Sequence, residues 1–136
     1  MSEGSRYSIN LDEAFGPLEL VDVAALTGDV EDRWFNQTLV RVNDCVVRLG
    51  VMQGEFHWHH HDEEDEFFYV VDGRFLIDLE EEDRTVELAP KQGFAVPRGV
   101  VHRTRAPERT VILMIEGAGV VPTGDEGGQS SERARG

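Results

Sequence analysis

The chain has 136 residues, with 27 acidic and 13 basic side chains, and therefore a net charge of −14. This length predicts one domain with a core of its own. The acidic charge argues against nucleic acids and anionic membranes as partners, because both are bound through Lys and Arg. The apolar runs are too short to span a bilayer and the N-terminus lacks the pattern of a secretory signal, so we expect a cytoplasmic protein.

The first 36 residues are expected to form an N-terminal extension ahead of the main domain. Residues 10–17 (NLDEAFGP) predict a single helical turn, because Asn10 can cap a helix and the Gly-Pro pair stops it. Residues 18–23 (LELVDV) predict a short strand, and residues 26–32 predict a loop. The predicted strand is also a candidate for covering an exposed sheet edge in a homodimer.

From residue 37 onward the sequence indicates short strands separated by turns. The predicted strands are 38–42, 45–52, 67–71, 74–79, 84–88, 94–97 and 110–116. The pair Asp72-Gly73 is typical of a hairpin turn, and predicts that the strands on either side of it pair with each other. The single cysteine, Cys45, lies in an apolar run and is expected to be buried. Many short strands without a convincing helix between them predict an antiparallel sandwich or barrel.

The stretch 54–73 (GEFHWHHHDEEDEFFYVVDG) combines four histidines with a block of carboxylates. Imidazole and carboxylate together suit borderline divalent metals. In an extended chain successive side chains alternate between two faces, so His59 and His61 point the same way while His60 points away. Glu66 begins an apolar run that should carry it into the interior, where a carboxylate needs a metal or a positive partner. The pattern predicts a metal site with His59, His61 and Glu66 as ligands.

Two further parts of the sequence bear on this site. The run Asp62–Asp65 is interpreted as a solvated acidic loop, because charge runs are usually exposed. In the stretch 97–102 (PRGVVH) a turn is followed by His102, which is a candidate for a fourth ligand. On chemistry alone, a single histidine after a turn is more often an ordinary surface or core residue.

Taken in order, these two stretches resemble the two motifs of the cupin superfamily. The first motif has two histidines one residue apart, a glutamate, and a glycine seven residues after the glutamate; the second has a proline, a glycine two residues on and a histidine three residues further. The matching residues are His59, His61, Glu66 and Gly73 in the first motif and Pro97, Gly99 and His102 in the second. The resemblance covers roughly residues 41–121, and it is specific because both motifs occur in order.

The resemblance also decides between two registers of the first motif. His57 and His59 are likewise one residue apart, but the glutamate that would accompany them, Glu64, is followed seven residues later by Val71 and not by glycine. We therefore expect His59 and His61 to be the ligands and His57 to point inward beside them.

The chain departs from the second motif at two positions. Lys91 stands where the motif usually has a glycine six residues before the proline, and Ala106 stands where it often ends in asparagine. We expect Gly93 to serve the turn in place of Lys91. Neither departure removes a metal ligand.

The resemblance implies an all-β fold: a double-stranded β-helix, or jelly-roll cupin barrel, over residues 37–121, preceded by the extension 1–36 and followed by a flexible tail, 122–136. It implies one divalent metal (Mn, Fe, Ni, Co or Zn) and a small-molecule ligand in the barrel mouth. The implied metal ligands are His59, His61, Glu66 and His102. Within the superfamily the chain looks most like the small single-domain proteins often labelled mannose-6-phosphate-isomerase-like, and small barrels of this type commonly form homodimers.

Two functions are compatible with the sequence. The first is a metal-dependent enzyme of dioxygenase, isomerase or lyase type, acting on a small organic molecule in the barrel mouth. The alternative is a non-catalytic module that binds or senses a small molecule or sugar and uses the metal structurally. No catalytic residue beyond the metal ligands is predicted, because no further acid, base or phosphate-binding motif stands out.

Overall fold

The computed structural model describes residues 8–28, 30–120 and 124. Its elements are β1 (Ser8–Asn10), α1 (Val23–Thr27), β2 (Trp34–Val42), β3 (Cys45–Glu55), β4 (Glu66–Asp72), β5 (Phe75–Leu79), β6 (Arg84–Leu88), β7 (Gly93–Val96) and β8 (His102–Gly117). None of the described residues form a helix long and apolar enough to cross a membrane. The predicted flexible tail, 122–136, lies outside the described residues except for Gly124.

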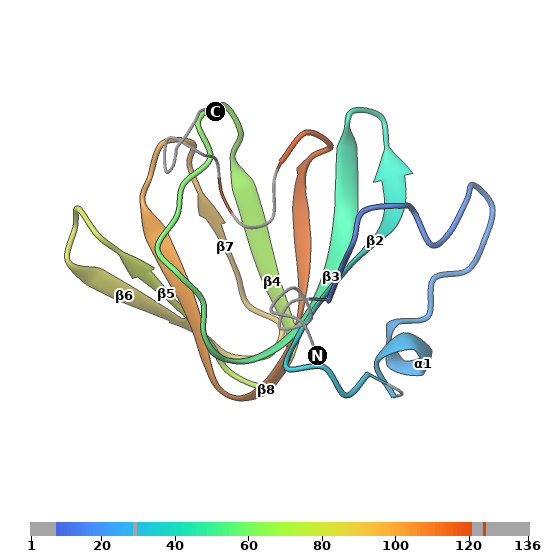
Figure 1. The fold of residues 1–136 in the computed structure, drawn as a ribbon, viewed down its shortest axis with the longest axis horizontal. Coiled ribbons are helices and arrows are strands. Elements are labelled where there is room, and N and C mark those ends of the chain that lie inside the picture. The colour runs from blue at the N-terminus through green and yellow to red at the C-terminus, as the bar shows by residue number, and fades with distance from the viewer. Residues whose placement is uncertain (1–7, 29, 121–123, 125–136) are drawn as a thin grey trace.

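The strands enclose an open cup (Figure 1). β5 and β6 form one side of the cup, β2 and β3 form the other, and α1 lies outside the wall. The hydrogen-bonded order is β1-β2-β3-β8-β4-β7, with β5 pairing to both β6 and β8. These pairs are antiparallel except for β1 and β2, which are parallel. The predicted all-β architecture is confirmed.

Strand β8 organises the barrel because it pairs with three other strands. Its residues 111–116 pair with β3 on one side and β4 on the other, and its residues 102–105 pair with β5. In the described sheet β4 and β5 therefore pair with different parts of β8 and not with each other. The predicted hairpin at Asp72-Gly73 is wrong. Gly73 instead forms a corner, where its φ is 100° and a Cβ would lie 2.7 Å from the Cα of Thr110.

The other predicted turns agree better with the structure. Asn43 lies in the hairpin that joins β2 to β3, and residues 80–83 join β5 to β6, as expected. In the turn before β7, however, the left-handed residue is Lys91, whose φ is 72°, and not Gly93. Gly93 is the first residue of β7, where a Cβ would lie 2.5 Å from the Phe67 ring. Glycine is therefore needed there for close packing, and the expectation that it serves the turn is wrong.

The N-terminal extension differs most from its prediction. Residues 10–17 do not form a helical turn, because Ser8–Asn10 pair with β2 as strand β1 and the next residues stay close to β2. The Phe15 N–H donates to the Leu39 carbonyl at 2.9 Å, so this donor is satisfied by the barrel and not by a helix. β2 itself begins at Trp34, inside the predicted extension.

Helix α1 occupies part of the segment for which a strand was predicted. It begins at Val23, so the predicted strand 18–23 is wrong. The Asp22 side chain accepts a hydrogen bond from the Ala25 N–H at 3.1 Å and caps the helix. Capping by Asp22, together with packing against the outside of the barrel, outweighs the alternating pattern that favoured a strand.

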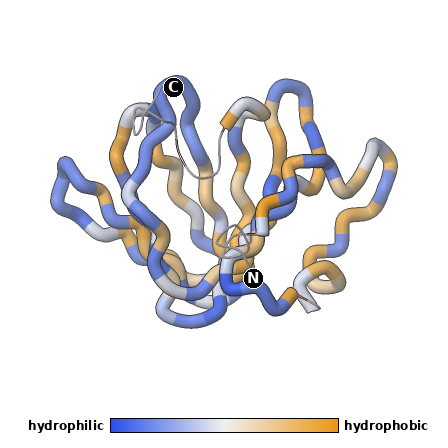
Figure 2. The backbone as a smooth tube through the Cα atoms, viewed as in Figure 1, coloured by the Kyte–Doolittle hydropathy of each residue, from blue (hydrophilic) through white to orange (hydrophobic). Residues whose placement is uncertain are grey.

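Apolar residues pack on both faces of the sheet formed by β2, β3 and β8. Figure 2 shows hydrophobic stretches along the strands and α1, and hydrophilic turns between them. The inner cluster contains Phe68, Val70, Phe75, Ile77, Leu79, Leu88, Val96, Ile112 and Met114. The outer cluster contains Leu39, Leu49, Val51 and Val111, and Phe15, Val21, Val23, Leu26 and Val30 of the extension pack against it. The extension therefore completes a second core, which the barrel alone would leave open to water.

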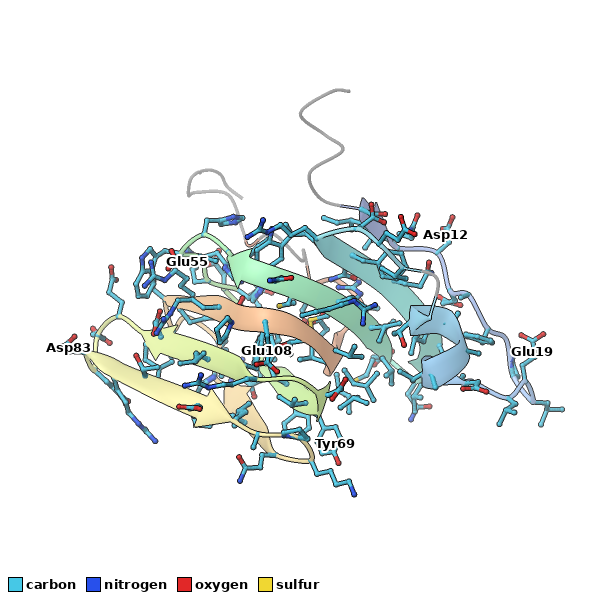
Figure 3. All side chains as sticks on the ribbon, turned by 90° about the horizontal axis from the view of Figure 1, so that it is seen from below. Asp12, Glu19, Glu55, Tyr69, Asp83 and Glu108 are labelled. Atoms are coloured by element: carbon cyan, nitrogen blue, oxygen red, sulfur yellow. The ribbon has the colours of Figure 1, made fainter. Side chains whose placement is uncertain are left out.

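Many charged side chains lie on the outside of the molecule, whereas Arg48, Glu66, Asp78 and Glu116 are buried. Figure 3 shows Asp12, Glu19 and Asp83 pointing outward at its edges. Cys45 is exposed at the start of β3, so the prediction that it is buried is wrong. The alternation of the strand explains this, because it turns the next residue, Val46, into the core and Cys45 away from it.

Candidate metal centre

The structure brings the four residues predicted as ligands together. His59 and His61 lie in the connection 56–65 between β3 and β4, Glu66 begins β4 and His102 begins β8. Each residue offers one possible ligand atom, and these four atoms all lie within 4.8 Å of one another. The connection is not a continuous strand, as the alternation argument assumed; it contains only an isolated β-bridge between His59 and His102. The rings of His59 and His61 still point toward the same site.

The β-bridge ties the two motifs to each other through the backbone. The His59 N–H donates to the His102 carbonyl, and the His102 N–H donates to the His59 carbonyl, both at 2.9 Å. The Gly99 N–H also donates to the His61 carbonyl at 2.8 Å. These contacts place the rings of His59 and His102 with their centroids 4.4 Å apart. The relative position of the histidines is therefore set by main-chain hydrogen bonds and not by the side chains alone.

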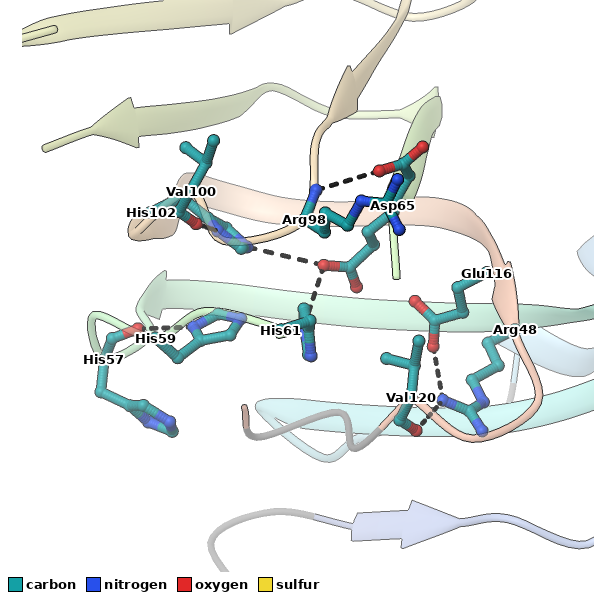
Figure 4. A network of polar contacts seen from close by, with 11 residues as sticks. Arg48, His57, His59, His61, Asp65, Arg98, Val100, His102, Glu116 and Val120 are labelled. Carbon is teal, nitrogen blue, oxygen red and sulfur yellow. Dashed lines mark hydrogen bonds and ion pairs between the residues drawn. The ribbon is translucent and has the colours of Figure 1, made fainter. Parts of the chain in front are cut away.

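Two of the histidines are oriented by backbone carbonyls (Figure 4). Nδ1 of His59 lies 2.9 Å from the carbonyl oxygen of His57, and Nδ1 of His102 lies 2.9 Å from that of Val100. Because a carbonyl can only accept, each Nδ1 must carry the hydrogen and donate it. The Nε2 atom of each ring then keeps its lone pair for a metal, which is the arrangement that metal-binding histidines need.

Burial keeps His59 in the form that can bind a metal. The four residues of the cluster are 1–9% exposed. Burial, followed by the neighbouring His102, lowers the pKa of His59 to about 3. His59 is therefore neutral across the physiological pH range, and its lone pair is free.

Glu66 stays ionised in spite of its burial. Burial alone would raise the pKa of this carboxyl, but hydrogen bonds from Nε2 of His102 and His61, in the states where that atom carries a hydrogen, outweigh it and hold the pKa well below its usual range. A bound metal would take the place of that hydrogen. Oε1 of Glu66 lies 3.2 Å from Nε2 of His61 and 3.5 Å from Nε2 of His102. Dashed lines in Figure 4 mark both contacts.

The cluster contains buried polar atoms that lack hydrogen-bond partners. Among the described residues this holds for Oε1 of Glu66, Nε2 of His102 and both ring nitrogens of His61. Leaving such atoms unsatisfied costs about 1–3 kcal/mol each. A cation that binds nitrogen and oxygen would satisfy them together, so the donor set fits a divalent transition metal.

A cavity adjoins the cluster on one side. It spans about 490 Å³ of space, part of which is open solvent. His59 and Glu66 form part of its wall, and the rest of the wall is largely aromatic and apolar, with Trp34, Phe56 and Phe68 among its residues. A mostly apolar wall with a few polar groups is typical of small-molecule sites.

More than half of the chain matches a known family. A family model described as a cupin domain matches residues 45–122, which include all four residues of the cluster. The chain is a member of the cupin family. The protein YdbB of Bacillus subtilis (strain 168) is 39% identical to this cupin over 98 residues, which cover 72% of this chain and 86% of YdbB.

Solved structures support the same conclusion about the fold. A cupin-2 domain protein from Shewanella frigidimarina superposes with a TM-score of 0.68 and 28% identity, covering 72% of this cupin and 94% of that chain. A protein from Neisseria meningitidis superposes with a TM-score of 0.66 and 19% identity, covering 73% and 99% of the two chains. The predicted double-stranded β-helix, or jelly-roll barrel, is confirmed.

The other two histidines of the stretch 54–73, His57 and His60, lie outside the cluster. The ring of His57 is exposed and points away from the cluster (Figure 4), so the prediction that it points inward is wrong. It stacks on Phe56, with ring centroids 4.2 Å apart, and lies edge-on to the His59 ring at 5.4 Å, while its carbonyl oxygen contacts Nδ1 of His59. His60 faces outward as predicted, where its Nε2 lies 3.0 Å from Oδ1 of Asp62. The irregular backbone of the connection explains why strict alternation fails for His57.

A second buried charged group lies beside the cluster and was not predicted. Glu116 is the register partner of Glu66 on β8, and Arg48 forms an ion pair with it. Arg48 also donates to the hydroxyl of Thr38 and to the carbonyl of Val120, each at 3.0 Å. Burial and the neighbouring Glu66 raise the pKa of Glu116, and Arg48 opposes this effect.

The sequence did contain a sign of this pair. Arg48 and Glu116 each stand within an otherwise apolar run, CVVRLGVM and TVILMIE, where a charged residue needs a buried partner. They lie 68 residues apart, so nothing local indicates that they meet. Pairing of β3 and β8 brings them together.

Proposed function

We propose that this cupin binds one divalent transition metal through His59, His61, Glu66 and His102, and that it acts as a metal-dependent enzyme on a small organic molecule. The observation that carries the proposal is that His59 and Glu66 belong both to the cluster and to the wall of the cavity. A ligand in the cavity would therefore lie next to the metal-binding atoms. Manganese, iron, nickel, cobalt and zinc all suit this donor set.

Each part of the site has a role in this proposal. When bound, the metal would supply Lewis acidity or activate oxygen, which suits dioxygenase, isomerase or lyase chemistry. The carbonyls of His57 and Val100 hold the rings of His59 and His102 with Nε2 available. Glu66 supplies a negative charge in surroundings that exclude water.

The alternative is a module that binds or senses a small molecule, or a sugar, without turnover. One observation favours it: among the described residues that line the cavity, only His59 and Glu66 are titratable between acidic and neutral pH. The proposal assigns both to the metal, so no separate acid or base remains for catalysis. Turnover would then depend on the metal and its bound water or oxygen alone.

Metal analysis of protein purified without added ions tests the site. We expect about one ion per chain, and a large loss of bound metal in each of His59→Ala, His61→Ala, Glu66→Ala and His102→Ala. His57→Ala and His60→Ala are matched controls that should keep their metal. Full occupancy in any two of the first four variants would contradict the assignment.

Activity assays then separate the enzyme from the module. Oxygen uptake would be measured with the metal-loaded protein on diols, keto acids and hydroxylated aromatic compounds, alongside product analysis for isomerisation and elimination. Turnover that disappears in Glu66→Gln supports the enzyme. Tight ligand binding without turnover under every metal supports the module.

Three predictions from the sequence stay predictions. They are membership of the mannose-6-phosphate-isomerase-like group, homodimerisation and a cytoplasmic location. Light scattering during size-exclusion chromatography tests the second of these, since a homodimer has twice the mass of the chain.

A further inference from the structure

We propose that the molecule bound in the cavity is an uncharged aromatic compound that carries a hydroxyl group. The inference rests on the proposed function, because it names the class of ligand that would bind beside the metal in the same site. It is argued from the walls of the cavity, from the absence of cations among the described residues that line it, and from one unpaired amide oxygen.

The walls of the cavity favour an aromatic ring. Trp34, Phe56 and Phe68 contribute rings, and Met52 and Met114 contribute thioether sulfurs. The ring centroids of Trp34 and Phe56 lie 5.3 Å apart, and the ring planes are tilted by 49°. Aromatic ligands gain from stacked or edge contacts with such rings and from contacts with sulfur, beyond the gain from burial that an aliphatic ligand shares.

The charge of the cavity argues against anions. The described residues that line it include no Lys or Arg. The buried Arg48 nearby is already engaged by Glu116, Thr38 and Val120. A phosphate or a carboxylate away from the metal would lose its hydration without gaining a partner. A phosphorylated sugar is therefore a poor fit.

The polar groups of the cavity are few, which also argues against polyhydroxylated ligands. Apart from His59 and Glu66, the described residues of the wall that offer polar side-chain groups are Asn36, Thr104 and Trp34, the last through its indole N–H. Oδ1 of Asn36 is buried and lacks a hydrogen-bond partner among the described residues. A single ligand hydroxyl could donate to it, whereas a sugar would leave several hydroxyls unpaired.

The chain offers an internal probe for this test. Its two tryptophans are Trp34, which lines the cavity, and Trp58, which is 41% exposed and stacks under Arg103. In a Trp58→Phe background Trp34 is the sole tryptophan, so its fluorescence reports on ligands that enter the cavity. Phenol, cyclohexanol, benzoate and mannose 6-phosphate would be titrated into this protein, both metal-free and metal-loaded. Phenol is expected to bind most tightly of the four.

Two pairs of variants locate the binding. Phe56→Ala is expected to weaken phenol binding about fivefold. Phe94→Ala is its control, because Phe94 is also half-buried but does not line the cavity, and it should leave the affinity unchanged. Asn36→Leu is expected to weaken phenol binding about fivefold while leaving benzene binding unchanged or stronger.

The outcomes separate this inference from the proposed function. Phenol binding to the metal-free protein that responds to Phe56→Ala supports the inference, even if no metal is ever found in the protein. The inference is overturned if mannose 6-phosphate, benzoate or cyclohexanol binds more tightly than phenol, even if the metal binds as proposed. It is also overturned if the affinity for phenol is unchanged in Phe56→Ala. Equal losses of benzene and phenol in Asn36→Leu would overturn the role of the hydroxyl.

Discussion

Two buried polar groups lie side by side in this cupin and differ in how they are satisfied. One is the cluster of His59, His61, Glu66 and His102; the other is the pair of Arg48 and Glu116. Both are buried, and Glu66 and Glu116 are register partners on β4 and β8. Most of the polar atoms in the pair have hydrogen-bond partners within the chain, whereas several possible ligand atoms in the cluster have none.

The difference shows what marks a binding site in a barrel interior. A buried charge alone does not indicate a function, because the ion pair of Arg48 and Glu116 has an adequate structural explanation. Buried lone pairs that converge on one point and remain unsatisfied require something from outside the chain. If this difference is real, changes in the pair should alter mainly the stability of the fold, and changes in the cluster should alter mainly metal binding.

The largest effect is expected from breaking the ion pair. Arg48→Met leaves Glu116 buried beside Glu66 without a counter-charge, and should lower the free energy of unfolding by about 3–5 kcal/mol, measured by urea denaturation. The double variant Arg48→Met, Glu116→Leu should recover most of this loss, because it removes both charges. A single variant as stable as the native protein would show that the pair is not needed structurally.

Removing the carboxylate of the cluster should act on the metal. Glu66→Gln is expected to lower metal affinity by at least about 100-fold, measured by competition with a chelator. The metal should also raise the melting temperature of the native protein but not that of the variant, since only binding to the folded state stabilises it. Glu64→Gln, in the neighbouring acidic loop, is the control and should bind metal normally.

A third charged group, on β5, extends the comparison to the barrel wall. Asp78 accepts hydrogen bonds from Arg105 at 2.7 and 2.9 Å, from Arg103 at 3.0 Å and from Thr85 at 2.7 Å. Mainly through Arg105, these contacts hold the pKa of Asp78 below its ordinary value of 3.8. Asp78→Asn is expected to lower the free energy of unfolding by about 2 kcal/mol at neutral pH.

The pH dependence of this effect has a definite sign. Because the pKa of Asp78 is lower in the folded chain than in the unfolded chain, its contribution is fully present above 3.8 and is lost as the pH falls through the folded value. The gap in stability between the native protein and Asp78→Asn should therefore narrow in acid. Denaturant titrations at several pH values check this, and a gap that widens in acid would contradict it.

The smallest effect is expected at Lys91, where the backbone is left-handed. Lys91→Gly removes the steric cost of a Cβ at this φ of 72°, and the greater freedom of glycine in the unfolded chain offsets part of the gain. We expect a net stabilisation of about 0.5 kcal/mol. Lys91→Ala keeps the Cβ and should bring no gain, so a gain of equal size in both variants would point to the lysine side chain and not to the backbone.

The metal cluster was the part of the structure most accessible from the sequence. His59 and His61 are spaced for one face of an extended chain, and Glu66 stands at the start of an apolar strand. The position of His102 followed only from the resemblance to cupins, because its approach to His59 depends on a long-range β-bridge. The predicted orientation of His57 was wrong for a different reason, because strict alternation holds only in a regular strand and the connection 56–65 is irregular.

Other features depend on contacts that no local pattern contains. The Asp72-Gly73 pair has the composition of a hairpin turn, yet pairing of β4 and β5 along β8 makes it a corner packed on Thr110. The N-terminal extension has weak preferences in its short segments, and packing against the outer cluster decides its structure. The cavity draws its walls from β1, β2, β3, β4, β8 and the histidine connection, so its aromatic character appears only after folding.

The placement of β8 has a consequence for how the protein is made. β8 pairs with β3, β4 and β5 and follows all of them in the chain. During synthesis the barrel cannot close until residues 102–117 have left the ribosome, because the central strand is missing until then. The partners of β8 lie far from it in sequence, and such non-local pairing makes folding slow. Until β8 arrives, the earlier strands expose apolar edges that can pair with other chains, so nascent chains stalled before residue 102 are expected to depend on chaperones.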